Sequence, residues 1–413
     1  MKIARDRYLN QIISHKHNGL IKIISGIRRS GKSYLLSELF QKHLLGSGVK
    51  KDHIIHLALD DYAKREYRNP DNCYQYVKAS IKDEKMHYLL LDEVQMMGNF
   101  EDVLNGFLHI KNLDVYVTGS NSKFLSTDVV TEFRGRGDEI RVFPLSFKEF
   151  FDAFGDHFED AWRQYYTFGG MPLAVLQNTD DEKVKYLKDL FLETYFKDIE
   201  ERNNIKNNQE LSELTDIIAS CVGCLINPQK LSDTFQTLKH SDISAPTIKT
   251  YLNYLEDSFI LDKVLRYDIK GKKYINTPSK YYFTDVGLRN ARLHFRQLEE
   301  SHLMENVIYN ELKIRGFEVD IGELDIYEKT NESYKPKKIE VDFIANKGNK
   351  KYYIQSALSM PTEEKQIQEK RPLLKINDSF KKIIVTKNDI MPYFDDNGIL
   401  TLGLKDFLLQ DEL

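Results

Sequence analysis

The chain has 413 residues, 41% of them hydrophobic and 30% charged, and its formal net charge is −4. This composition excludes a globally basic protein, so any surface for nucleic acid has to be local, and the length allows about two to four globular domains. The charged N-terminus and the lack of a run of about 20 apolar residues predict a cytoplasmic protein without a membrane segment. Three cysteines are too few for a disulfide framework, and we expect Cys221 and Cys224 to face a helical core rather than a metal.

A phosphate-binding loop is the first strong motif. Residues 1–20 alternate charged and apolar side chains, as an amphipathic helix does. The sequence GIRRSGKS follows at residues 26–33 and fits the pattern G-x-x-x-x-G-K-[ST], between an apolar run at 20–24 and a helical pattern at 34–40. Lys32 is expected to reach the β- and γ-phosphates of a nucleotide, and the Ser33 hydroxyl is expected to bind Mg²⁺. The predicted nucleotide contacts are Gly26, Ile27, Arg28, Arg29, Ser30, Gly31, Lys32, Ser33 and Tyr34.

Two acidic residues follow a later strand. Apolar runs at residues 54–59 and 88–91 predict two strands, and the second run ends in Asp92-Glu93. A buried parallel strand presents such residues at the C-terminal edge of its sheet, where the phosphate loop also lies. We expect Asp92 to hold Mg²⁺, directly or through water, and Glu93 to act as the general base toward the attacking water.

The next predicted strand, residues 113–117, ends in a polar turn. Ser120 or Asn121 from this turn is expected to lie beside Glu93 and to contact the γ-phosphate or the water, with Asn121 as the candidate catalytic residue. The sequence does not separate the two side chains, and a simple turn is the alternative.

A glycine-flexed loop then carries two arginines, Arg134 and Arg136. Either one is a candidate arginine finger, which neutralises charge on the transferring phosphoryl group, and Arg136 is taken as the catalytic candidate. A finger that acts on a neighbouring subunit requires a homo-oligomer. A solvated loop is the alternative.

Five predicted strands that alternate with helices indicate an α/β fold, a doubly wound and mostly parallel sheet over residues 1–150. Together with residues 142–150 and 169–172, these motifs resemble the prokaryotic AAA-type P-loop ATPases that carry a C-terminal module of winged-helix and restriction-endonuclease-like parts. The resemblance covers nearly the whole chain and is looser beyond residue 200. It implies ATP as the nucleotide, self-association and ATP turnover.

The middle of the chain predicts two smaller parts. Residues 151–205 have aromatic and charged side chains at helical spacing, which indicates a helical lid beside the nucleotide. Residues 206–295 predict short helices and then a hairpin around Gly271, which is the order of a winged helix. One hypothesis is that residues 244–280 contact double-stranded DNA, and the other is that they pack or bind a protein. The basic residues of the hairpin are Lys263, Arg266, Lys270, Lys272, Lys273 and Lys280.

Residues 296–413 resemble the restriction-endonuclease-like fold. The predicted elements are a helix at 305–315, strands at 317–321, 325–327, 340–345 and 351–355, and then a helix and a strand at 382–386. Such nucleases use two carboxylates and a lysine beside an acidic helix. Glu305 and Asp342 match this pattern, whereas Gln355 and Ala357 stand where the second carboxylate and the lysine belong. An amide is a weak Mg²⁺ ligand and alanine carries no charge, so we expect this domain to be catalytically inactive.

The leading hypothesis is therefore an ATPase that uses ATP and Mg²⁺ and couples hydrolysis to a C-terminal module that recognises DNA or an unknown protein partner. The alternatives are a nucleotide-gated switch with very slow turnover and an ATP-dependent nuclease. Glu93 favours turnover, since a pure binder has no need of that carboxylate. Gln355 and Ala357 disfavour the nuclease.

Overall fold

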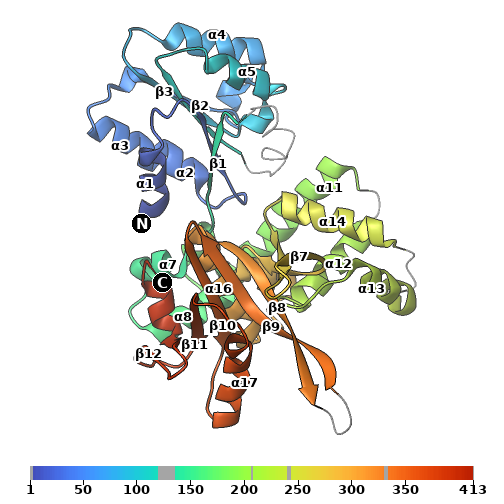
Figure 1. The fold of residues 1–413 in the computed structure, drawn as a ribbon. Helices are drawn as coiled ribbons and strands as arrows, with labels where there is room; N and C mark the ends of the chain where they lie inside the picture. The colour runs from blue at the N-terminus through green and yellow to red at the C-terminus, as the bar shows by residue number, and fades with distance from the viewer. Residues whose placement is uncertain (1–2, 120–134, 206–207, 240–242, 330–333, 413) are drawn as a thin grey trace. The chain divides into compact units, whose positions relative to one another are not determined.

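The computed structural model describes residues 3–119, 135–205, 208–239, 243–329 and 334–412 (Figure 1). The chain divides into two compact units, residues 1–144 with 257–259 and residues 145–256 with 260–413. We refer to them as the first and the second unit. Within the described residues, every helix is too short or too polar to span a bilayer.

The first unit is built on a five-stranded parallel sheet with the strand order β2-β3-β4-β1-β5 (Figure 1). The predicted doubly wound α/β sheet is confirmed. β1 lies between β4 and β5, and all five of its residues are buried, which agrees with its three isoleucines. The strands are β1 (Ile21–Ser25), β2 (Ile54–Ala58), β3 (His87–Asp92), β4 (Leu113–Thr118) and β5 (Gly137–Arg141).

Helices cover both faces of this sheet (Figure 1). Successive side chains of a strand point to opposite faces, so Leu90 of β3 lies in one core and Leu89 and Leu91 lie in the other. The first face is covered by α1 (Asp6–Ser14) and by a continuous helix made of α2 (Lys32–Tyr34), a π-helical segment (Leu35–Phe40) and α3 (Gln41–Gly46). The second face is covered by α4 (Pro70–Ser80) and α5 (Phe100–Phe107). Short 3₁₀ turns occupy Lys51–His53, Tyr62–Arg68 and Val94–Met96.

The second unit contains an eight-stranded mixed sheet with the strand order β12-β13-β11-β10-β9-β8-β6-β7. β8 is one long strand, although the sequence predicts two shorter ones, because pairing with β9 continues across an irregularity between Asp320 and Gly322. The strands are β6 (Leu261–Asp268), β7 (Lys273–Phe283), β8 (Glu318–Lys329), β9 (Tyr334–Lys347), β10 (Lys350–Ala357), β11 (Lys381–Thr386), β12 (Tyr393–Phe394) and β13 (Ile399–Gly403).

The predicted hairpin around Gly271 is present as the antiparallel pair β6 and β7. It is not a separate wing, because β6 also pairs in parallel with β8, with Arg266 opposite Ile321 and Asp268 opposite Glu323. The hairpin therefore forms one edge of the same sheet as the predicted nuclease-like strands.

The helices of residues 145–256 belong to the second unit. The Asp285 carboxylate accepts a hydrogen bond from the Gly170 N–H (2.7 Å), and the Asn290 amide donates to the Tyr166 carbonyl (2.8 Å). The division into four domains predicted from the sequence stays a prediction. These helices are α7 (Phe147–Phe154), α8 (Phe158–Phe168), α9 (Pro172–Val175), α10 (Asp180–Asp189), a π-helical segment (Leu190–Phe196), α11 (Lys197–Asn203), α12 (Asn208–Ser220), α13 (Pro228–Thr234), a second π-helical segment (Phe235–Lys239) and α14 (Ala245–Asp257).

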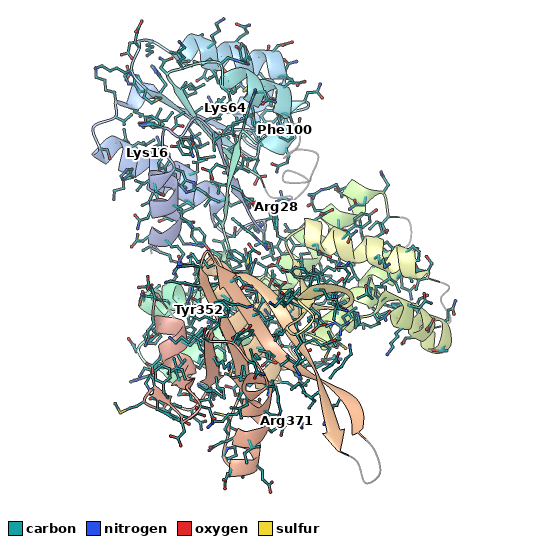
Figure 2. All side chains as sticks on the ribbon, in the orientation of Figure 1. Lys16, Arg28, Lys64, Phe100, Tyr352 and Arg371 are labelled. Carbon is teal, nitrogen blue, oxygen red and sulfur yellow. The ribbon has the colours of Figure 1, made fainter. Side chains whose placement is uncertain are left out.

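The remaining helices pack on the large sheet. One apolar core forms where α17 covers the sheet, and it includes Tyr353, Ala357, Leu373 and Ile384. The position of β10 in this sheet can be found in Figure 2 from its labelled residue Tyr352. The helices are α15 (Val286–Arg292), α16 (Glu300–Ile314), α17 (Glu363–Leu374) and α18 (Leu404–Leu409).

Candidate nucleotide-binding site

The phosphate loop joins the end of β1 to the start of α2, as predicted. Gly26 has φ +129°, and a Cβ there would lie 2.2 Å from the Val142 carbonyl oxygen. Gly31, which immediately precedes α2, has φ +96°. Both positions therefore require glycine, and the loop closes tightly enough to direct its N–H groups toward a phosphate. Arg28 is an exposed residue of this loop (Figure 2).

Lys32 lies folded over the inside of the loop. Its ammonium donates to the carbonyl oxygens of Gly26 (2.8 Å) and Ile27 (2.9 Å), and the side chain is almost fully buried. Burial lowers the pKa of Lys32 to about 8, and the carboxylates of Glu93 and Asp92 act in the opposite direction. Both carboxylates act on the Lys32 ammonium, so the phosphate loop and the Asp92-Glu93 pair form a single site.

The acidic pair is held by a threonine of the neighbouring strand. The Thr118 hydroxyl, fully buried at the end of β4, donates to the Asp92 carboxylate and accepts from the Glu93 N–H (2.9 Å). Glu93 has φ +53°, which turns the chain sharply after β3, and its carboxylate accepts from the Gln95 amide. The sequence indicates a polar turn beside Glu93 but not this role for Thr118. Ser120 and Asn121 lie outside the described residues.

Arg5, the residue before α1, braces the loop, a contact that sequence reasoning missed. Its guanidinium donates to the carbonyl oxygens of Ser30 (3.1 Å) and Phe143 (2.6 Å) and stacks 4.7 Å from the centre of the Tyr8 ring. The Tyr8 hydroxyl accepts from the Phe143 N–H (3.2 Å). The signal present in the sequence is an arginine directly before a helix whose third residue is a tyrosine.

Arg136 does not lie at the site of its own chain. Its carbonyl accepts from the Ile21 N–H (2.9 Å), and Ile21 pairs with Gly137 at the start of the parallel strands β1 and β5. The phosphate loop leaves β1 at the other end. A role of Arg136 as an arginine finger, offered to a neighbouring subunit, stays a prediction. Arg134 lies outside the described residues.

Similarity to known proteins agrees with this geometry. Residues 18–151 match a family described as an AAA domain, and residues 159–299 match a family described as a domain of unknown function. An uncharacterized protein of Haemophilus influenzae is 32% identical over 419 residues, which cover 99% of each chain. The protein belongs to the AAA family of P-loop ATPases. Membership of this family supports ATP binding and ATPase activity.

Further relatives of this AAA ATPase are more distant. An uncharacterized protein of Methanocaldococcus jannaschii is 28% identical over 390 residues, which cover 89% of this chain and 82% of the relative. Among solved structures, Cdc6p of Pyrobaculum aerophilum is 13% identical with a TM-score of 0.29, covering 73% of this chain and 96% of that chain.

The second unit of the AAA ATPase holds a buried charged cluster where the nuclease-like residues were predicted. Glu305 of α16 and Asp342 of β9 both belong to it, and Lys280 of β7 lies 3.1 Å from Glu305 and 2.6 Å from Glu340. Burial, together with Glu305, raises the pKa of Asp342 well above its usual range. Sequence reasoning missed Lys280 as a member of this cluster. The nuclease pattern has its lysine at the position of Ala357 on β10, whereas Lys280 lies on β7.

This cluster differs from a nuclease site in two respects. Lys280 is 4% exposed, and although burial alone would lower its pKa, Glu305 and Glu340 raise it. Its charge is therefore held between two carboxylates. Ala357 lies in the apolar core under α17, and the Gln355 amide donates to Glu369 (3.4 Å). The expected lack of nuclease activity stays a prediction.

The basic hairpin is also less basic than predicted. Arg266 is buried in an ion pair with Glu323, and Lys280 is buried in the cluster above, so neither side chain can reach a nucleic-acid phosphate. The other four basic residues are exposed: Lys263, Lys270, Lys272 and Lys273. The preceding helix α14 is capped by Ser244, whose hydroxyl accepts from the Thr247 N–H (3.3 Å), as predicted.

Proposed function

We propose that the protein hydrolyses ATP with Mg²⁺ at the phosphate loop and that ATP turnover changes how the second unit binds a partner. The observation that carries the first part is the bridge from Thr118 to Asp92 and Glu93, beside the ammonium of Lys32. In this arrangement one buried hydroxyl joins the Asp92 carboxylate to the backbone of Glu93.

The residues present fit the substrate and the ion. Ser33 and Asp92 offer hydroxyl and carboxylate oxygens, which are the donors that Mg²⁺ prefers, and the ion neutralises charge on the phosphates when bound. Lys32 exchanges its two carbonyl partners for phosphate oxygens, because an anionic acceptor makes a stronger hydrogen bond than a neutral one. Glu93 accepts the proton of the attacking water, so its carboxylate must leave Gln95 for that water.

The partner is proposed to be double-stranded DNA or a protein. The exposed lysines of the β6–β7 hairpin support DNA, since they follow α14 in the order of a winged helix. The burial of Arg266 and Lys280 leaves fewer basic side chains for DNA, which favours a protein partner. Self-association is proposed because Arg136 is exposed at a distance from its own loop, where it can face a neighbouring subunit.

Steady-state phosphate release from ATP, with and without double-stranded DNA, tests the proposal. Release should vanish in Lys32→Ala, and Glu93→Gln should bind ATP yet fail to hydrolyse it. Stimulation by DNA that disappears when Lys270, Lys272 and Lys273 are replaced by alanine would assign the hairpin. Stimulation that persists in that triple variant would place the DNA contact elsewhere, and release that ignores DNA would favour a protein partner. Phosphate release by Glu93→Gln equal to that of the parent would refute the assignment of the general base.

The second candidate function is a nucleotide-gated switch with very slow turnover. The contact between Gln95 and Glu93 favours it, because a base held by an amide is not poised for water. In that case phosphate release by the parent protein would not exceed that of Lys32→Ala, while ATP would still change the oligomeric state or partner binding.

A further inference from the structure

A cluster of two histidines and an aspartate lies at the opposite edge of the first unit's sheet from the nucleotide site. His53 immediately precedes β2, His87 is the first residue of β3, and Asp83 lies in the connector from α4 to β3. The phosphate loop and Asp92 follow the other ends of the parallel strands. Each of the three residues offers one ligand atom, and these atoms lie within 4.8 Å of one another. In the described part of the chain this is the one such group of three His, Cys, Asp or Glu side chains.

The two imidazoles are buried and held in fixed orientations. His53 is 5% exposed and His87 is fully buried, and their ring centres lie 4.5 Å apart. The Nδ1 of His87 lies 2.7 Å from the Lys85 carbonyl oxygen, so it carries the proton and donates. The Nε2 of His87 is then an acceptor, and its contact with the Lys82 N–H is long, at 3.3 Å. A carbonyl that fixes the tautomer through the other ring nitrogen is the usual companion of a metal-binding histidine.

The third ligand is an accessible carboxylate on a fixed loop. One Asp83 oxygen lies 3.2 Å from the Nε2 of His53, and the other accepts from the Lys85 N–H (2.8 Å), which holds the pKa of the carboxyl below its usual range. The Asn112 amide donates to the Asp83 carbonyl (2.8 Å), which fixes the connector against the sheet. The Asp83 side chain is 44% exposed and provides the route by which an ion enters.

We propose that His53, Asp83 and His87 bind one divalent transition-metal ion, with Zn²⁺ as the best match, and that the ion ties the α4–β3 connector to the start of β2. Imidazole nitrogens with one carboxylate suit Zn²⁺, whereas Mg²⁺ prefers oxygen ligands throughout. Three protein ligands leave a fourth position for water. On binding, the proton of His53 Nε2 moves to Nδ1 or to solvent, and the ion replaces the His53–Asp83 and Lys82–His87 hydrogen bonds. This site does not depend on the proposed function of the nucleotide site.

Titration of the chelator-treated, full-length protein with ZnCl₂ in a calorimeter tests the proposal. We expect one Zn²⁺ per chain in a protein that carries Cys221→Ser and Cys224→Ser. These substitutions remove the two cysteines that lie close to each other in the sequence and could bind Zn²⁺ themselves. Asp83→Asn in this background should weaken binding at least about tenfold. His56→Gln, an exposed histidine on β2, is the matched control and should leave binding unchanged. Circular dichroism of each variant confirms that it is folded.

Three results would overturn the proposal. The first is no Zn²⁺ binding by the folded protein that carries Cys221→Ser and Cys224→Ser. The second is binding that survives Asp83→Asn with unchanged affinity. The third is displacement of Zn²⁺ by equimolar Mg²⁺, which would indicate an oxygen-only site. Because His87 is fully buried and its replacement can impair folding, Asp83→Asn alone suffices to decide the second result.

Discussion

Lys22 and Lys32 are both buried lysines of the first unit, but their partners give them different roles. Lys22 of β1 forms an ion pair with the buried Asp114 of β4, and the Tyr116 hydroxyl donates to the same carboxylate (2.7 Å). Its charge is neutralised within the fold. Lys32 donates to two neutral carbonyl oxygens, so its charge is compensated only by the nearby Asp92 and Glu93 and by a phosphate that binds there. The first lysine is structural, and the second is suited to a ligand.

ATP affinity should fall as the pH rises through about 8, because only the protonated Lys32 attracts the phosphates. The folded pKa is lowered by burial, so above this pH the lysine must take up a proton before it can pair with ATP, which weakens binding by up to about tenfold per pH unit. Titrations with a fluorescent ATP analogue between pH 7 and 9 measure this. Lys32→Arg stays charged and should show no such dependence, whereas an equal slope in both proteins would contradict the prediction.

At the scale of elements, the site depends on where parallel strands end. β3 and β4 are neighbours, so Thr118 and Asp92 meet at one edge of the sheet although they are far apart in sequence. The loop between α8 and α9 shows the same kind of dependence in the second unit. Gly169 has φ +71°, and a Cβ there would lie 2.2 Å from the carboxylate of Asp285, which caps α15.

Thr118→Val should lower the rate of ATP hydrolysis at least tenfold while ATP still binds. The variant keeps the shape of the side chain but leaves the buried Asp92 carboxylate and the Glu93 N–H without their common partner. Phosphate release and ATP affinity are measured together. Thr118→Ser retains the hydroxyl and should remain active, and a fully active Thr118→Val would show that the bridge is dispensable.

Asp285 should make the second unit less stable as the pH rises from about 4 to 6. Burial raises the pKa of Asp285 to about 6, against the hydrogen bonds from Gly170 and Leu288. The pKa of Asp285 is higher in the folded protein than in the unfolded chain, so the protonated carboxyl stabilises the fold below about pH 4, the unfolded pKa. This stabilisation, roughly 3 kcal/mol, is lost as the pH rises through about 6. Urea unfolding should show the stability of the parent relative to Asp285→Asn decreasing over this range. An increase would mean that the two hydrogen bonds outweigh burial.

At the scale of the whole molecule, the chain divides into two compact units, and the four domains predicted from the sequence pattern stay a prediction. The first unit has an apolar core on each face of its own sheet. In the second unit, β6 and β7 share a sheet with the strands beyond residue 317. The ion pair of Arg266 with Glu323 lies across this junction and is buried.

A fragment of residues 296–413 should therefore fail to unfold cooperatively, whereas residues 145–413 should do so. Loss of β6 exposes an edge of β8 and removes Arg266, which leaves Lys338 as the ion-pair partner of the buried Glu323 carboxylate. Thermal and urea unfolding of both fragments, followed by circular dichroism, test this. Equal midpoints for the two fragments would support an independent C-terminal domain instead.

The sequence by itself determined the phosphate loop, the strand ending in Asp92-Glu93 and the parallel sheet that brings them together. These features depend on local patterns: glycines where the backbone must turn, apolar runs where a strand is buried on both sides, and polar residues at strand ends. The hairpin around Gly271 could also be predicted, because a turn residue between two apolar runs is a local signal.

Only the tertiary structure decided which side chains meet across elements. The bridge by Thr118, the brace by Arg5, the burial of Arg266 and Lys280, and the grouping of His53, Asp83 and His87 each join residues from separate elements. It also placed Arg136 at the far end of β1 from the loop. The physical reason is that strand order and register set these distances, and no short window of sequence contains that information.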